Sequence, residues 1–570
     1  MSSRKTSSVA AGAIIFSVGM LMSRFLGLLR ENLLQQTFGN SDTTGAFKLA
    51  FMVPDLFYYL LAGGAMSAAF IPVFVSYLSK GKDEEAHKVG STIATFLLIA
   101  MSICVAICMI FAPAIFHLLP ASRKFTPEAF NLTVSLTRIM CVMLIFTAQS
   151  GHLTGILNSY KHFVAPVVVW NVYTLASLFG ITVLTKLPLF GGSPQHPNIH
   201  GVAYGVLLGA FLLAAIQFPV AIRHGFRFTF MLDFAHEGVQ QVFKLFVPVM
   251  VSLSLSQVNI LMIPQVMGSN FGLPAVNDIN NANKLVMLPF SLFAAAIGTA
   301  VFPTLAQQAT NGENSAFRET LSKAMKMILI LSIPSAVGLL VLADPLSCLL
   351  YGGGRFGMQG IQATSYVLQM FAWAVVGLGL AQVVNRAFYS LHDTITPTIV
   401  SIAMVVGNFA FSWYLASFSH FKYGSVAIAT TITSTVSTVV LVELLRKRLK
   451  GIGGRSLLTM TLKVLFASAL MGVAVYYIAA VLSPVIDGNL LRPVFRWDAP
   501  FLPFSVNDMS IQLNLSHLSR LKLLIQVGVS MCIGMGIYAF VLWGLGVKEL
   551  KLITDRFTAK LRRKRNLSVV

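Results

Sequence analysis

Charged side chains stand inside long apolar stretches of this chain, where a charge is costly to bury. Arg24 follows a long apolar run, and Arg30 and Glu31 come shortly after it. An arginine at the centre of a membrane helix costs about 2.5–3.5 kcal/mol on insertion scales, so such a residue is usually kept for a function. The charged residues found within apolar segments are Arg24, Arg30, Glu31, Lys48, Asp55, Arg138, Lys284 and Arg386.

Cations outnumber carboxylates in this set, which predicts a basic cavity suited to an anionic ligand. The planar guanidinium of arginine matches the geometry of phosphate oxygens. Some members have a structural alternative: Arg30 and Glu31 could mark the end of a helix at the membrane surface, and Lys48 could extend toward the interface. Arg386 could be a satisfied structural residue. The candidate binding residues are Arg24, Arg30, Lys284, Lys48, Glu31 and Arg386.

The chain carries no motif of a known catalytic or metal-binding type. It lacks a Walker phosphate loop, an H-E-x-x-H metal motif, a nucleophile elbow and a cluster of metal ligands. We therefore expect no enzymatic activity, no bound metal and no organic cofactor. Transport would then be driven by a coupling ion (Na⁺ or H⁺), by the membrane potential or by substrate supply. Gln257, Asn259 and Asn408 could alternatively supply oxygen ligands to a sodium ion.

The composition is that of an integral membrane protein. Of the 570 residues, 56% are hydrophobic and 11% are charged, whereas soluble proteins carry about 25% charged residues. A net charge of +21 in a soluble protein would suggest nucleic acid. Here the basic residues are concentrated in alternate loops between apolar segments, as the positive-inside rule describes. We therefore expect no nucleic-acid partner and both termini in the cytoplasm.

The sequence repeats itself at a nearly constant interval. LNSYKHFVAP at 157–166 matches FYSLHDTITP at 388–397, and AFIPV at 69–73 matches VFPTL at 301–305. A repeat unit with an even number of helices gives two parallel copies, an arrangement found in transporters that work by alternating access. The predicted fold class is an all-α integral membrane protein with about 14 transmembrane helices.

The predicted organisation has two six-helix lobes followed by two further helices. The N-lobe covers 1–228, the C-lobe covers 229–450, and 451–570 holds helices 13 and 14. A long external loop near 484–518 and a basic cytoplasmic tail belong to this last part. Proline lacks a backbone N–H and kinks helices, and the predicted kink sites are Pro54, Pro72, Pro289 and Pro303.

Several segments resemble one family of membrane transporters. SRFLGLLRENLLQQTFG at 23–39, GAMSAAFIPVFVSYL at 64–78 and NRAFYSLHDTITP at 385–397 resemble the MurJ (MviN) lipid II flippases of the MOP exporter superfamily. The resemblance implies that the protein flips lipid II, the undecaprenyl-diphosphate-linked peptidoglycan precursor. Movement would be from the inner to the outer leaflet of the bacterial cytoplasmic membrane, in support of cell-wall biogenesis and cell shape. Its partners would be this lipid, the membrane and cell-wall synthesis proteins.

The family's binding residues carry over only in part. Its two arginines in helix 1 match Arg24 and Arg30, the acidic residue that follows matches Glu31, and its arginine in helix 8 is Lys284 here. The acidic residue before helix 2, the paired arginines in that helix and the residues after them are replaced by Gly45, Tyr58, Tyr59 and Gly63. These departures leave open a flippase for another polyprenyl-diphosphate glycan. A cation-coupled exporter of the MATE type and a membrane scaffold are further alternatives.

Overall fold

The chain is almost entirely helical in the part that the computed structural model describes. Ten described helices are long and apolar enough to cross a membrane, or eleven if the bent pair α15 (Met358–Phe371) and α16 (Ala374–Ser390) forms one span. This confirms an all-α, multi-pass membrane protein, whereas the count of 14 stays a prediction. The described residues are 19, 22–61, 65–119, 124–160, 162, 164–259, 263–417, 423–483, 485–486, 489–490 and 517–547.

The structure divides into two compact units, and the described part of the first contains residues up to Asn277 together with Leu350–Gly357. Its helices begin with residues 22–38. They continue with α2 (Asp42–Leu61), α3 (Ala65–Ser79), α4 (Asp83–His117), α5 (Pro127–Cys141), α6 (Met143–Ser159), α7 (Val164–Thr182), α8 (His200–Arg223), α9 (Glu237–Gln257) and α10 (Ile263–Ser269). The short helices η2 (Leu184–Lys186) and η3 (Pro188–Phe190) join α7 to α8.

Local sequence explains where the helices of this unit begin. Asp83, Glu84 and Glu85 occupy the first turn of α4, where carboxylates are stabilised by the helix dipole. Thr126 caps α5 by accepting the backbone N–H of Ala129 through Oγ1 at 3.2 Å. Packing then assembles them, with α7 against α8, α2 against α5, α6 against α8 and α3 against α9.

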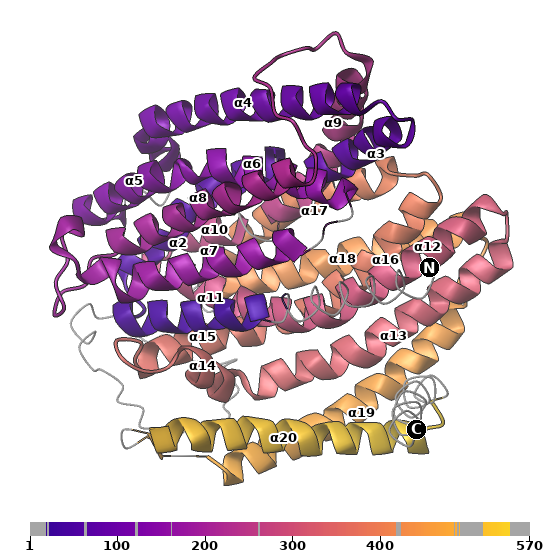
Figure 1. The fold of residues 1–570 in the computed structure, drawn as a ribbon. Helices are drawn as coiled ribbons and strands as arrows, with labels where there is room; N and C mark the ends of the chain where they lie inside the picture. Colours follow the sequence, from indigo (N-terminus) through magenta and orange to yellow (C-terminus); the bar gives the residue numbers. More distant parts are fainter. Residues whose placement is uncertain are drawn as a thin grey trace, which may run out of the picture. The chain divides into compact units, whose positions relative to one another are not determined.

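The second unit holds the remaining described helices. They are α11 (Leu273–Pro289, of which residues after Asn277 belong here), η5 (Phe290–Ala294), α12 (Ala295–Thr310), α13 (Asn314–Val341), α14 (Ala343–Tyr351, of which residues up to Leu349 belong here), α15, α16, α17 (Ile395–Ala416), α18 (Gly424–Arg448), α19 (Gly454–Val481) and α20 (His517–Gly544). Two short antiparallel strands, β1 (Val485–Ile486) and β2 (Asn489–Leu490), pair Val485 with Leu490. Figure 1 shows α19 and α20 running alongside each other.

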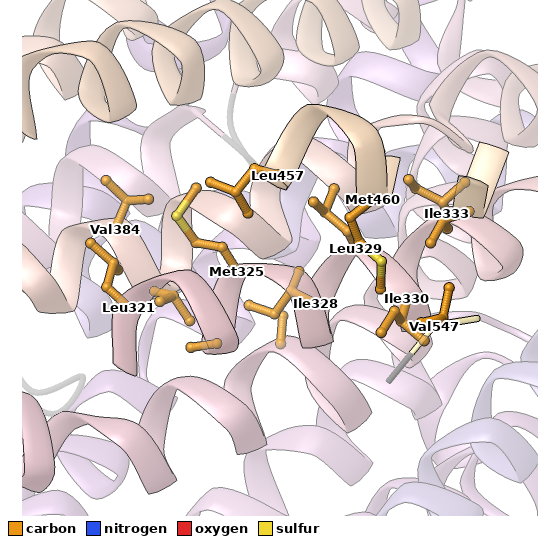
Figure 2. Packing of buried hydrophobic residues seen from close by; sticks show 14 of the residues in the cluster. Leu321, Met325, Ile328, Leu329, Ile330, Ile333, Val384, Leu457, Met460 and Val547 are labelled. Carbon is orange, nitrogen blue, oxygen red and sulfur yellow. The ribbon is translucent and has the colours of Figure 1, made fainter. Parts of the chain in front are cut away.

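The core of the second unit is built around α13. Figure 2 shows Leu321, Met325 and Ile328 of this helix packed with Val384 of α16 and Leu457 of α19. Each is almost completely buried, and burial of a large aliphatic side chain contributes about 1.5–3 kcal/mol. This packing fixes α16, which carries Arg386.

The predicted kink prolines lie within or at the ends of helices. Pro54 is inside α2, Pro72 inside α3 and Pro303 inside α12. Pro289 ends α11 and directly precedes the π-helical turn η5, a departure from α-helical bonding that often accompanies functional sites. The 45° bend between α15 and α16 has no proline beside it and was not predicted. The kink roles and the division at 228 and 450 stay predictions.

Candidate functional site

The first helix, residues 22–38, changes from exposed to buried along its length. Arg24 is exposed, Arg30 is half-buried and Glu31 is buried. Its second half is anchored because Leu34 and Phe38 belong to the same buried apolar cluster as residues of α2, α5, α7 and α8. The carboxyl-terminal half of the helix is therefore packed into the first unit, and the two arginines lie before this packed half.

Glu31 forms a buried ion pair with Lys48 of α2. Lys48 Nζ donates to Glu31 Oε1, and the two side chains are only 6% and 3% exposed. Gln35, one turn further along the first helix, also donates to Glu31 Oε1 at 3.1 Å. A buried charge needs a partner and hydrogen bonds to offset its desolvation. Two predicted binding residues are thus engaged with each other, which makes this pair a link between the first helix and α2.

The polar contacts continue from Gln35 to α11. Gln35 Nε2 donates to Asn277 Oδ1 at 2.8 Å, and Asn277 Nδ2 donates to Gln35 Oε1 at 3.0 Å and to Asn40 Oδ1 at 3.0 Å. Gln35 and Asn277 are completely buried. Sequence reasoning missed these residues, although the polar run VNDINNANK at 276–284 inside a predicted span was a usable signal. Buried polar networks of this kind fix one arrangement of neighbouring helices.

Gly45, where the family resemblance leads us to expect an acidic residue, lies against the backbone of Leu273 at the start of α11. A Cβ atom added at Gly45 would come within 2.0 Å of the carbonyl oxygen of Leu273, well inside the contact distance of any two heavy atoms. An aspartate therefore does not fit here without movement of the chain. Lys48, one helical turn later, supplies the charge that α2 directs toward the first helix.

Among the described residues, Arg30 differs from its neighbour Glu31 in having no hydrogen-bond or ion-pair partner. In the part of the chain that the structure describes, the Arg30 guanidinium makes no ion pair and no hydrogen bond, and it is half-buried. A guanidinium with five donors that lacks a protein partner is available to an anionic ligand. Arg24, six residues earlier, is exposed on the same helix. The two cations thus form the basic part of the candidate site in the first unit.

Two further predicted residues lie in the second unit. Lys284 is partly exposed on α11. Arg386 of α16 lies over the ring of Phe302 with 5.9 Å between the guanidinium carbon and the ring centroid, and its side chain lies against Gly298 of α12. This cation–π contact gives Arg386 a packing role within its unit. The side chains of Tyr58 and Tyr59, and Gly63, lie outside the described residues.

Among the alternative sodium ligands, Asn408 links two helices, and the sodium-binding role stays a prediction. Asn408 Nδ2 donates to Thr430 Oγ1 at 3.2 Å, and Asn408 Oδ1 accepts from Ser412 at 3.3 Å, so this amide joins α17 to α18. The side chain of Gln257 lies outside the described residues. Within the described ranges, no group of three or more His, Cys, Asp or Glu side chains could hold a metal ion.

The fold defines the class of protein as an all-α multi-pass membrane protein. A solved structure titled "Lipid II flippase MurJ, inward closed conformation" has a TM-score of 0.71 at 22% identity, covering 93% of this chain and 99% of that chain. An inward-facing multidrug resistance MATE family transporter of the MOP superfamily has a TM-score of 0.62 at 14% identity, covering 77% and 98%. These likenesses concern the fold.

Sequence comparison gives the family. A family model described as lipid II flippase MurJ matches residues 34–493. A probable lipid II flippase MurJ of Haemophilus influenzae is 27% identical over 475 residues, covering 80% of this chain and 90% of that protein. The lipid II flippase MurJ of Burkholderia cenocepacia is 26% identical over 393 residues, covering 68% and 74%. The chain belongs to the lipid II flippase MurJ family.

Membership of this family confirms the predicted resemblance and the transporter class. The family is named for moving a lipid across a membrane, which is not a catalytic class. The matched residues begin after Arg24, Arg30 and Glu31, so the assignment of these three rests on their own sequence pattern and on the geometry above.

Proposed function

We propose that this protein flips lipid II, an undecaprenyl-diphosphate-linked peptidoglycan precursor, from the inner to the outer leaflet of the bacterial cytoplasmic membrane. A diphosphate cannot cross hydrocarbon without compensation for its charge. The observation that carries the proposal is Arg30, a half-buried guanidinium without a protein partner in the described residues. Its neighbour Glu31 is held by Lys48, so the carboxylate does not neutralise the arginine.

The mechanism we propose separates positioning from binding. The buried pair of Glu31 and Lys48 and the amides of Gln35 and Asn277 hold the first helix in place. Arg30 and Arg24 on that helix then bind the diphosphate oxygens, where a charge-assisted contact is about twice as strong as a neutral one. Lys284, which lies in the second unit, stays a further predicted binding cation. We propose alternating access of two six-helix lobes as the cycle.

Further parts of the proposal concern location and energy. Both termini lie in the cytoplasm, because they are on the same side as the loops that are richer in Lys and Arg, and such loops face the cytoplasm. The driving force is a Na⁺ or H⁺ gradient or the membrane potential, and cell-wall synthesis proteins are the expected protein partners. Arg386 stays a predicted member of the binding set.

Complementation of a bacterium depleted of its own flippase tests this function. The wild-type chain should restore growth and prevent accumulation of lipid-linked precursors, and Arg30→Ala should abolish both effects while still inserting into the membrane. Arg455→Ala is the matched control, because Arg455 is an exposed cation at the start of α19 and should leave function intact. Survival of function in both Arg30→Ala and Arg24→Ala would contradict the diphosphate-binding role.

A second candidate function follows from Gly45. The close approach of the Leu273 carbonyl to this glycine removes the acidic group that the family resemblance leads one to expect. A cargo with a different glycan on the same polyprenyl diphosphate is therefore the alternative. Failure of the wild-type chain to complement, with normal amounts of folded protein in the membrane, would favour it.

A further inference from the structure

The connection between α8 and α9, residues 224–236, carries apolar side chains in an unusual pattern for a loop. This segment, here called the strap, has no helix over 225–233. Large apolar residues recur at every second position: Phe226, Phe228, Phe230, Leu232 and Phe234. Figure 1 shows the strap running as a loop beside α4. Residues two apart share one face of a uniformly extended chain, yet Phe226 is buried and the later members are exposed, so the strap changes its surroundings along its length.

The first residues of the strap are fixed to α4. Phe226 is buried, and its ring lies so close to Gly90 that a Cβ atom there would come within 2.7 Å of it. Ser91 Oγ donates to the Arg227 carbonyl at 3.3 Å and accepts the Thr229 N–H at 3.1 Å. These bonds satisfy backbone groups that a lipid environment would leave without partners.

The second end of the strap returns to the same helix. The Phe234 ring meets the Phe96 ring edge-on, with 6.1 Å between centroids. His236 Nε2 lies 2.7 Å from Glu85 Oε2 in the first turn of α4. The strap is therefore attached to α4 from the level of Glu85 to that of Phe96.

The position of these contacts along α4 corresponds to one edge of the hydrocarbon core of a membrane. The strongly apolar part of α4 covers residues 96–116, about 30 Å at 1.5 Å per residue, which equals the thickness of the hydrocarbon core. Within it, Ile99, Ile103 and Ile107 form an exposed stripe at helical spacing, as expected of a lipid-facing surface. Residues 89–95, to which the strap is attached, contain Gly90, Ser91 and two threonines and so lie at the headgroup boundary.

The strap beyond Phe226 carries apolar side chains that are exposed. Phe228, Phe230, Leu232 and Phe234 are 37%, 69%, 47% and 49% exposed. Arg223 and Arg227 are exposed beside them, and Asp233 is used in capping the turn at Ala235 and His236. Apolar side chains at the acyl boundary with arginines beside the phosphates are the pattern of interfacial membrane segments.

We propose that the strap is an interfacial membrane anchor that inserts into the leaflet nearer the start of α4. Phe228, Phe230 and Leu232 enter the acyl boundary, and Arg223 and Arg227 contact lipid phosphates. Phospholipid is the occupant that matches exposed phenylalanine and leucine side chains with exposed arginines beside them. The inference is independent of the transported lipid, because it concerns the surface loop between α8 and α9 and not the candidate binding site.

Photo-crosslinking in native membranes tests the anchor. A diazirine analogue of phenylalanine is placed at Phe230 in the full-length chain, and the adducts are identified by mass spectrometry. Ile110, 68% exposed on α4, is the positive control, and buried Phe226 is the negative control. Phospholipid adducts at Phe230 should match those at Ile110 and exceed those at Phe226 about tenfold, as expected for a side chain in the acyl boundary.

Two outcomes would overturn the proposal. One is capture of another protein at Phe230 in place of phospholipid, which would make the strap a protein-docking surface. The other is quenching of the probe by water without adducts, which would place the strap outside the bilayer. The same measurement with the analogue at Leu232 guards against a local effect of a single position.

Discussion

The buried ion pair between Glu31 and Lys48 predicts a strong and specific coupling between two helices. Lys48→Met removes the cation from a pair whose side chains are 6% and 3% exposed. The Glu31 carboxylate then stays buried without its ammonium, although it keeps the hydrogen bond from Gln35. Loss of one partner of a buried pair costs about 3–5 kcal/mol. We therefore expect this single change to lower the free energy of unfolding by that amount.

Removal of both charges should restore most of the loss. Glu31→Gln in the Lys48→Met background leaves a neutral amide that still accepts from Gln35, and replacement of both members of a buried pair is often near neutral. The double variant should therefore be more stable than Lys48→Met by about 2 kcal/mol or more, a coupling typical of residues in contact. The exposed pair of Glu443 and Arg446, at 3.2 Å, is the control: Glu443→Gln should cost at most about 1 kcal/mol.

Denaturant unfolding of the full-length protein in detergent measures all four members of this cycle. The complementation assay, run in parallel, reports whether each variant keeps the flippase function that depends on Arg30. If the double variant is as unstable as the sum of the two single changes, the side chains are not coupled and the positioning role fails. Wild-type stability of Lys48→Met would refute the reasoning as well.

Three further predictions concern backbone contact, pH and the second unit. Gly45→Ala places a methyl group within 2.0 Å of the Leu273 carbonyl oxygen and should lower the free energy of unfolding by about 1–3 kcal/mol, measured by thermal unfolding. The control is Gly27→Ala, which has open space around it and should raise the free energy of unfolding by about 0.5–1 kcal/mol. Equal effects of the two changes would contradict the close approach at Gly45. Burial raises the pKa of Asp393, but bonds from Thr396 and the nearby Arg448 outweigh it and hold that pKa below its ordinary value of 3.8. The stabilisation that the Asp393 carboxylate gives the folded state is then complete above pH 3.8 and is lost as the pH falls through the lowered pKa. The difference in melting temperature between wild type and Asp393→Asn should therefore be constant from pH 5 to 8 and shrink in acid. A difference that grows in acid would show that the pKa of Asp393 is raised in the folded state. Lys284→Arg should keep lipid II flipping and Lys284→Ala should lose it in the complementation assay, and equal activity of the two would remove Lys284 from the site.

Much of the fold could be predicted from the sequence, because its causes are local. Apolar segments long enough to span a bilayer must form helices there, since only helices and closed barrels satisfy the backbone in lipid. The family segments around Arg24, Arg30 and Pro72 are likewise contiguous in the chain, so the family could be recognised without coordinates. The bend between α15 and α16 could not, because no proline or other local signal marks it.

The sequence by itself determined the class of this protein and the types of its candidate binding residues. Which of those charges have partners was decided only by the tertiary structure. Glu31 and Lys48 are 17 residues apart in the chain, and Gln35 and Asn277 are 242 apart, yet each pair is joined by direct hydrogen bonds. Pairing of this kind depends on how helices pack against each other, which no spacing along the chain specifies. Packing alone thus left Arg30 available for an anion while it engaged its neighbour Glu31.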